Sequence, residues 1–103
     1  MSKAAFLRKR VERVQVGDET FHVRPLTGAQ FETLLANEGD ERLDGVRALS
    51  LVACFCACDE TGARIFADEE LQQLREEGDF AVIKAVAEAA LKASGLEADE
   101  GNG

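Results

Sequence analysis

A chain of 103 residues has room for a single domain with one modest hydrophobic core. Its 46% hydrophobic and 31% charged residues are typical of a folded protein and exclude a wholly disordered chain. The net charge of −8 argues against nucleic acid or an anionic membrane surface as a partner, because both would repel the protein. No apolar run of about 18 residues and no signal-peptide pattern is present, so we expect a cytoplasmic protein.

The charge is distributed unevenly along the chain. Residues 1–14 contain five basic side chains and one acidic side chain, whereas the rest of the chain is strongly acidic. We therefore interpret residues 1–9 as a basic N-terminal arm in front of an acidic body. The arm can meet an acidic partner, including another copy of the body, or its charges can simply be solvated. Phe6 and Leu7 within it can dock on a partner or fold back over the core.

Alternating apolar residues predict two half-buried strands, over residues 10–16 and 20–26. Gly17 and Asp18 between them are strong turn formers, so we expect the strands to form an antiparallel hairpin. Pro25 lacks a backbone N–H and therefore ends the second strand or confines its end to a sheet edge.

Two loop lengths are compatible with this hairpin. A four-residue loop over residues 17–20 would place Val16 opposite Phe21. A two-residue loop would place Val16 opposite Glu19. We predict the longer loop.

Helical spacing begins after the hairpin. Thr27 is a candidate N-cap for a first helix, and Asn37 and Gly39 are its stop signals. Residues 43–57 are almost uninterrupted apolar and predict a second helix at the buried centre of the protein. Its inward stripe consists of Val46, Leu49, Val52, Ala53 and Cys56.

Leu51 and Phe55 lie off the main stripe of this central helix. The helix is therefore either covered on both sides by neighbouring elements or leaves an apolar patch for a partner. The sequence leaves both arrangements open.

The remaining elements are shorter. Residues 59–62 predict a turn, and residues 63–66 predict a short extended piece that can form an edge strand. Asp68 is a candidate cap for a short helix through Glu77. Asp79 is a candidate cap for an alanine-rich last helix closed by Ser94 and Gly95, whose inward stripe consists of Phe80, Ile83, Ala87 and Leu91.

Together these elements predict an α+β fold that is predominantly helical. An N-terminal β-hairpin, with room for a short third strand, would pack on about four α-helices. Residues 10–95 would form the single domain. Residues 96–103 would form a disordered acidic tail, because nearly all of them are acidic, small or polar.

Three closely spaced cysteines are the most conspicuous candidate for a chemical site in the sequence. Cys54, Cys56 and Cys58 could hold zinc or an iron–sulfur cluster only if their thiolates converged, but on a helix Cys56 points away from the other two. We predict buried thiols and no metal or cofactor. The lone His22, with Ser50 inside an apolar helix, is a poor basis for nucleophilic catalysis, so we predict no enzyme activity.

Two short motifs suggest a family. Residues 23–27 (VRPLT) lead from a strand into a helix, and residues 58–62 (CDETG) end the apolar helix before residues 65–70 (IFADEE). With the basic start and the alanine-rich last helix, this order over residues 10–95 resembles the tail assembly chaperones of long-tailed bacteriophages.

The resemblance implies a protein that acts in the cytoplasm of a bacterial host. It would bind the tape measure protein, keep it soluble and help tail tube subunits polymerise around it, and it would be absent from the finished virion. The tail tube protein and further copies of the chain are additional candidate partners. A rival interpretation is a small acidic inhibitor that mimics nucleic acid and occupies a basic groove.

The candidate partner contacts are apolar and basic residues of the arm, of the start of the first predicted strand and of the first two predicted helices. They are Phe6, Leu7, Arg8, Arg10, Phe31, Leu35, Leu51 and Phe55.

Overall fold

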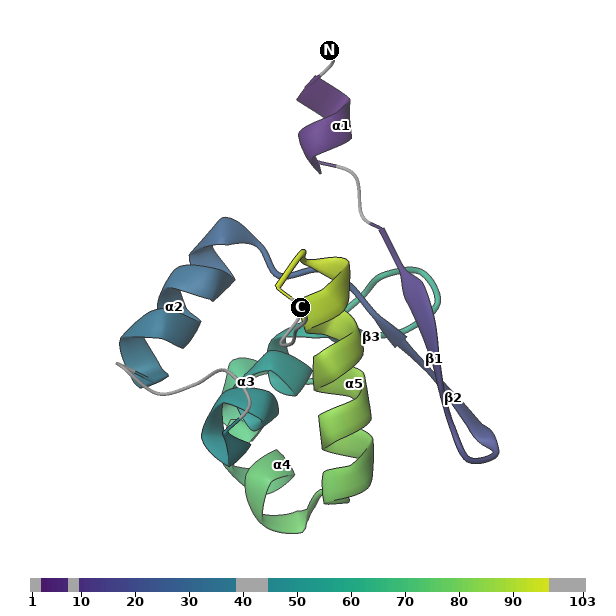
Figure 1. Ribbon diagram of the computed structural model, residues 1–103, viewed down its shortest axis with the longest axis vertical. Coiled ribbons are helices and arrows are strands. Elements are labelled where there is room, and N and C mark those ends of the chain that lie inside the picture. The colour runs from purple at the N-terminus through teal and green to yellow at the C-terminus, as the bar shows by residue number, and fades with distance from the viewer. Residues whose placement is uncertain (1–2, 8–9, 39–44, 97–103) are drawn as a thin grey trace, which may run out of the picture.

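The computed structural model describes residues 3–7, 10–38 and 45–96. The elements, in chain order, are α1 (Lys3–Leu7), β1 (Glu12–Val16), β2 (Glu19–Val23), α2 (Gly28–Glu38), α3 (Val46–Cys56), β3 (Ala57–Cys58), the 3-10 helix η1 (Asp68–Glu70), α4 (Leu71–Glu77) and α5 (Phe80–Ala93). One antiparallel sheet has the order β1-β2-β3, and α3 and α5 pack against each other beside it (Figure 1). The predicted α+β class is confirmed, including the hairpin, the short third strand and the predominance of helix.

The hairpin has a two-residue turn, so the predicted four-residue loop is wrong. Val16 lies opposite Glu19. Gly17 has a φ of +61°, the left-handed conformation that the first position of a tight hairpin turn requires. Across the next pair, the hydroxyl of Thr20 donates a hydrogen bond of 2.9 Å to the side-chain oxygen of Gln15. The local geometry of the turn thus sets the register.

The third strand lies at the end of the predicted central helix and not at residues 63–66. Ala57 leaves the helix with a φ of −63° and a ψ of 130°, and it pairs with Val23 of β2. Residues 63–66 contribute only an isolated bridge between Arg64 and Cys58. Pairing with a distant strand therefore ends the helix before residue 57.

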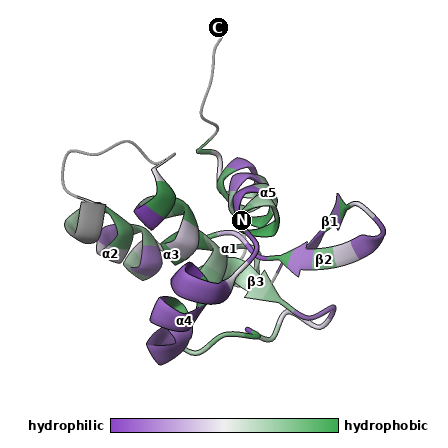
Figure 2. Ribbon diagram, turned by 90° about the horizontal axis from the view of Figure 1, so that it is seen from below, coloured by the Kyte–Doolittle hydropathy of each residue, from purple (hydrophilic) through white to green (hydrophobic). Residues whose placement is uncertain are grey.

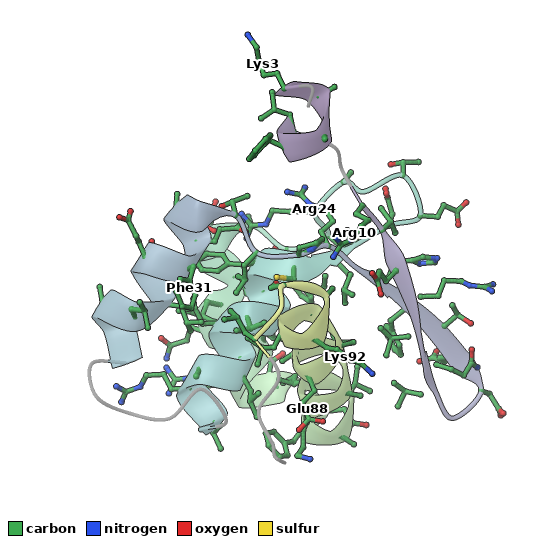
Figure 3. All side chains as sticks on the ribbon, turned by 45° about the horizontal axis from the view of Figure 1, so that its top comes forward. Lys3, Arg10, Arg24, Phe31, Glu88 and Lys92 are labelled. Carbon is green, nitrogen blue, oxygen red and sulfur yellow. The ribbon has the colours of Figure 1, made fainter. Side chains whose placement is uncertain are left out.

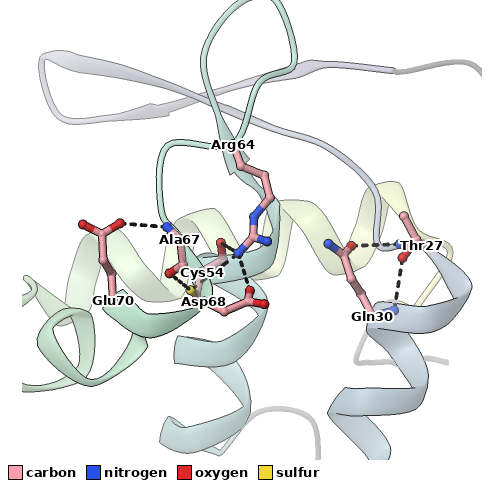
Figure 4. Close-up of polar contacts among 7 residues, drawn as sticks. All are labelled: Thr27, Gln30, Cys54, Arg64, Ala67, Asp68 and Glu70. Carbon is pink, nitrogen blue, oxygen red and sulfur yellow. Dashed lines mark hydrogen bonds and ion pairs between the residues drawn. The ribbon is translucent and has the colours of Figure 1, made fainter.

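A reciprocal cap starts α2, as the sequence predicts. The hydroxyl of Thr27 accepts a hydrogen bond of 3.1 Å from the N–H of Gln30, and the side chain of Gln30 accepts one of 3.0 Å from the N–H of Thr27 (Figure 4). The helix ends at Glu38. The predicted stop at Gly39 lies outside the described residues.

Helix α3 is the buried centre of the fold. Its residues from 48 to 56 are all buried, which confirms that neighbouring elements cover it on both sides. Val46 is 60% exposed, so its predicted place on the inward stripe is wrong; it lies in the first turn, before the helix enters the core. Residues 43 and 44, the predicted start of this helix, lie outside the described residues.

The core joins the sheet to three helices. Figure 2 shows hydrophobic residues along α3 and α5 and mostly hydrophilic residues along α4. Within the described part of the chain, no helix is long and apolar enough to cross a membrane. The largest fully buried side chains of the core are Leu34, Leu49, Val23 and Val52.

The short η1–α4 unit has a different cap from the predicted one. Ala67 takes the N-cap position, and its N–H donates a hydrogen bond of 2.7 Å to the carboxylate of Glu70 (Figure 4). Asp68 is not the cap, because it already lies within η1 and its carboxylate accepts a hydrogen bond from Arg64.

Asp79 caps α5 as predicted. Its carboxylate accepts a hydrogen bond of 2.9 Å from the N–H of Ala81. The predicted place of Phe80 on the inward stripe is wrong: it is exposed, because it is the first residue of the helix and lies at the edge of the core. At the other end, the N–H of Leu96 donates to the carbonyl of Leu91, and the Leu96 side chain packs against the core.

Candidate functional site

An open depression of about 320 Å³, here called the apolar groove, lies between the sheet, the 63–66 segment and helices α4 and α5. Glu19 and Asp79 are the charged residues among those that line it. Ile65 in its wall is 53% exposed. The apolar side chains that form it include Phe21, Ile65, Phe66, Leu74, Val82 and Val86. Such a surface can receive apolar side chains of a partner, and its acidic residues favour a partner with basic ones.

Local geometry explains how distant segments meet in this groove. The alternation of β2 turns Phe21 toward the same side as Val23, which is fully buried. Val82 and Val86 are four residues apart and therefore share one face of α5. The N–H of Ile65 donates a hydrogen bond of 3.2 Å to the carbonyl of Ala57, so the 63–66 segment is held along β3.

Arg64 fixes this segment to α3. Its guanidinium donates hydrogen bonds to the carbonyl of Cys54 at 3.1 Å and to the carboxylate of Asp68 at 2.9 Å (Figure 4). The guanidinium also lies 5.6 Å from the ring centroid of Phe55, within range of a cation–π interaction. Its Nε is buried without a hydrogen-bond partner among the described residues. We interpret Arg64 as the residue that positions one wall of the apolar groove.

The turn before Arg64 is closed by its own acidic residue. The carboxylate of Asp59 accepts hydrogen bonds from the N–H and the hydroxyl of Thr61, at 2.8 and 2.6 Å, and from the N–H of Ala63 at 3.1 Å. These bonds, that of the Thr61 hydroxyl first, lower the pKa of Asp59 below its ordinary value. The carboxylate thus has a structural role within the turn.

The three cysteines are buried free thiols, with Cys54 and Cys56 in α3 and Cys58 in β3. Burial raises the pKa of all three and brings that of Cys56 to about 12, although Arg24 acts in the opposite direction on Cys56. Thiols of this kind are poor nucleophiles and poor metal ligands at neutral pH.

His22 lies in the middle of the sheet, between Arg13 on β1 and Cys58 on β3. It is half-buried, because β3 pairs with β2 on the other side from β1. Across the described residues, no three His, Cys, Asp or Glu side chains converge in a way that could hold a metal ion.

The predicted contacts in the arm lie at the far end of the molecule from α4. Phe6 and Leu7 are 78% and 74% exposed, and α1 projects away from the body instead of folding back over the core (Figure 1). Arg10 is also exposed, and its guanidinium donates a hydrogen bond to the carbonyl of Ala93 at the end of α5. Arg8 lies outside the described residues.

The other predicted contacts lie around α2 and α3. Phe31 is half-buried against the core, and Leu35 is exposed. Leu51 and Phe55 are buried, but both line a small hollow of about 180 Å³ that Thr33 of α2 also lines. The structure therefore separates the predicted contacts that it describes into a group near the N-terminus and a group around α2 and α3.

Sequence reasoning missed the apolar groove, because its walls come from segments up to 67 positions apart, from Glu19 to Val86. One local signal was present. Ile65 and Phe66 are adjacent apolar residues directly after a charged turn, and they precede another acidic run. A pair of this kind in a connecting segment indicates either a packing contact or a binding surface.

Comparison with known proteins gives a structural match at the level of the whole fold. No family model matches the sequence, and no curated protein matches it. The solved structure of the bacteriophage HK97 tail assembly chaperone matches with a TM-score of 0.65 over 90% of this chain and 91% of that chain. The two sequences are 20% identical. The fold of this chain is therefore that of a tail assembly chaperone, which agrees with the resemblance in its sequence.

Proposed function

We propose that this chain is a tail assembly chaperone of a long-tailed bacteriophage. In this role it binds the tape measure protein in the cytoplasm of the bacterial host, keeps it soluble and promotes assembly of the tail tube. It is absent from the mature virion and has no catalytic activity, cofactor, nucleic acid or membrane as part of its function.

The observation that carries this proposal is the fold shared with the HK97 tail assembly chaperone over nine-tenths of both chains. The sequence supports it independently, because the order of its VRPLT and IFADEE segments resembles the same family. A fold alone does not define an activity, so the binding surface supplies the second part of the argument.

The apolar groove is the surface that we assign to the tape measure protein. A long helical protein that awaits assembly exposes apolar stripes, and a groove lined by Ile65 and Phe66 can cover such side chains. Glu19 and Asp79 favour positions where basic residues flank the stripe. Each contact is small, so many copies along one partner would bind through the sum of weak contacts.

The hollow lined by Leu51 and Phe55 is a second proposed contact for the same partner. Helix α2 contributes Thr33 to this hollow, and it also carries Phe31, half-buried against the core, and the exposed Leu35. A continuous helix of the tape measure protein has an apolar stripe that can fill such a hollow with one large side chain.

Self-association is a further part of the proposal, next to binding of the tail tube protein. The basic arm and the acidic body have opposite charges, so the arm of one copy can contact the body of the next. Deletion of residues 1–10 should lower the association state measured by light scattering at low salt. Unchanged association after this deletion would remove the arm from the proposal.

Co-expression with the tape measure protein tests the proposed function. We expect the large partner to become soluble and to co-purify with this chain. If the partner stays insoluble and does not co-purify, the chaperone function is wrong. The acidic-inhibitor interpretation then becomes the one to test, with heparin or DNA as competitor for a basic partner.

A pair of matched variants tests the assigned surface. Ile65→Asp places a charge in the apolar groove, whereas Val46→Asp places the same charge at an equally exposed apolar position on α3 outside it. We expect Ile65→Asp to lower the recovered partner several-fold and Val46→Asp to leave it unchanged. Equal recovery with both variants would show that the partner binds elsewhere.

A further inference from the structure

A second groove, here called the basic groove, is lined by other residues than the apolar groove. It encloses about 590 Å³ between α1 and the segment that leads into α2. Its walls include Phe6, Leu7, Arg10, Arg24, Pro25 and Leu26. The proposed tape measure surface has none of these residues, so the two grooves are separate.

The charge of this groove is opposite to that of the protein as a whole. Among the described residues that line it, the charged ones are Arg10 and Arg24, in a chain whose net charge is −8. Figure 3 shows Arg10 and Arg24 where α1 joins the body, with Lys3 farther out on α1. The protein holds both arginines in place, since Arg10 donates to the carbonyl of Ala93 and Arg24 donates to that of Gly62 at 3.0 Å. The Nε of Arg10 also lies 3.5 Å from the carboxylate of Glu12. Each guanidinium has five N–H donors, so donors of both arginines still remain for a carboxylate of a ligand.

The apolar side of the groove is uncovered. Phe6 and Leu7 are the most exposed large apolar side chains among the described residues, and no residue of α1 is buried. A five-residue helix with two bare apolar side chains gains little stability from its own hydrogen bonds. It is stabilised when another molecule covers these side chains.

Charge and apolar surface together define what the groove can accept. The ligand must bring carboxylates for the two arginines and large apolar side chains for Phe6 and Leu7. The chain's own acidic segment 97–103 has three carboxylates but no large apolar side chain, so it meets only half of this requirement. An amphipathic helix with an acidic polar face meets both parts.

We propose that the basic groove is a second docking site, which takes an acidic amphipathic helix from another protein. Glu19 and Asp79 at the apolar groove disfavour an acidic helix, whereas Arg10 and Arg24 at the basic groove favour it. The chain can therefore hold two different segments at once. This inference does not depend on what binds the apolar groove. It assigns Phe6, Leu7 and Arg10 to another protein, and it is therefore an alternative to the self-association through the arm proposed above.

A synthetic peptide tests the proposal on the full chain. The probe is a peptide of about 18 residues with Leu at helical spacing and Glu elsewhere, long enough to form a helix. A second peptide carries Lys in place of every Glu. We expect the Glu peptide to shift the NMR signals of the backbone N–H groups of residues 5–7 and 26–28, and to bind more weakly as salt is added. We expect the Lys peptide to leave these signals unchanged.

Two variants separate the apolar and the charged parts of the site. Replacing Phe6 and Leu7 together by Ala changes only exposed side chains, and should weaken binding about tenfold or more. Arg10→Gln removes one groove charge and should weaken binding several-fold. Arg13→Gln removes an exposed charge on β1 that does not line the groove, and should have little effect.

Several results would overturn the proposal. These are no binding of the Glu peptide, equal binding of the Lys peptide, equal binding by the Phe6 and Leu7 double variant, or signal shifts confined to residues of the apolar groove. Signals of residues 5–7 and 26–28 that move when Glu97, Asp99 and Glu100 are neutralised, without peptide, would assign the groove to the chain's own segment. If the same signals move when the protein is diluted without peptide, the basic groove is instead occupied by a second copy of the chain.

Discussion

Arg64 and Asp68 lie four positions apart in sequence and are joined by a hydrogen bond of 2.9 Å, but the two side chains differ in how deeply they are buried. The side chain of Arg64 is 27% exposed and that of Asp68 is 72% exposed. Only Arg64 reaches further into the protein, to the carbonyl of Cys54. The hydrogen bond from Arg64 to the carbonyl of Cys54 therefore contributes more to the stability of the fold than the ion pair with Asp68 does.

Replacing Arg64 by Met should lower the free energy of unfolding by about 2 kcal/mol, because the carbonyl of Cys54 loses a charged hydrogen-bond donor. Asp68→Asn is the matched variant. It should cost less than about 0.5 kcal/mol, since an exposed ion pair contributes little. Urea unfolding measures both values. Equal losses would mean that the ion pair, and not the carbonyl contact, holds the wall of the groove.

Gly78 ends α4 at a position where a side chain does not fit. A Cβ at this residue would lie 2.5 Å from the carbonyl oxygen of Leu74 and 2.9 Å from the Cδ1 of Ile83. Gly78→Ala should therefore destabilise the protein by about 1–3 kcal/mol in urea unfolding, since backbone must move. Gly28→Ala is the control, because nothing lies within 4 Å of its Cβ and α2 starts there. It should be neutral or slightly stabilising. A loss of the same size for Gly28→Ala would argue against a local clash at residue 78.

Local signals explain why the fold class was predictable. The cap at Thr27, the cap at Asp79 and the turn at Gly17 each depend on residues that are close in sequence. The length of the hairpin loop was not predictable from alternation. Both registers place Val14 and Val16 on the same face as the apolar residues of the second strand, so only the turn geometry distinguishes them.

Long-range contacts explain what the sequence did not reveal. The end of α3 is set by pairing of Ala57 with Val23, which lies 34 positions earlier in the chain. Aspartate is a common helix cap, but the carboxylate of Asp68 accepts a hydrogen bond from Arg64 instead. Both grooves are built from segments that meet only in the folded chain. The sequence could therefore identify individual candidate residues such as Phe6 and Leu7, but it could not reveal the grooves that they line.

The reciprocal cap of α2 gives a third stability prediction. Thr27→Ala removes the hydroxyl that accepts from the N–H of Gln30, and should lower the free energy of unfolding by about 1 kcal/mol. Thr27→Ser keeps the hydroxyl and should cost only a few tenths of that value. Urea unfolding compares the two. A full loss with Ser would mean that the methyl group, and not the cap, is the stabilising part.

The buried thiol of Cys56 predicts how stability changes at alkaline pH. Burial raises its pKa from an ordinary 9.0 to about 12, so between these values the native state keeps a proton that the unfolded state has lost. This contribution to stability is fully present below pH 9 and is lost as the pH rises toward 12. The slope is about −1.4 kcal/mol per pH unit for one thiol. The chain contains no tyrosine, so no phenol titrates in the same range.

Cys56→Ala isolates this effect, because it removes one titrating group while Cys54 and Cys58 remain. At pH 7 the variant should be less stable than the original chain, since a smaller side chain leaves the core less well packed. Above pH 9 the difference in the free energy of unfolding should shrink by about 1.4 kcal/mol per pH unit and then reverse in sign. Urea unfolding at pH 7, 9, 10 and 11 measures it. A difference that stays constant to pH 11 would mean that Cys56 ionises in the native state as readily as in the unfolded chain, and that α3 is open to water at this residue.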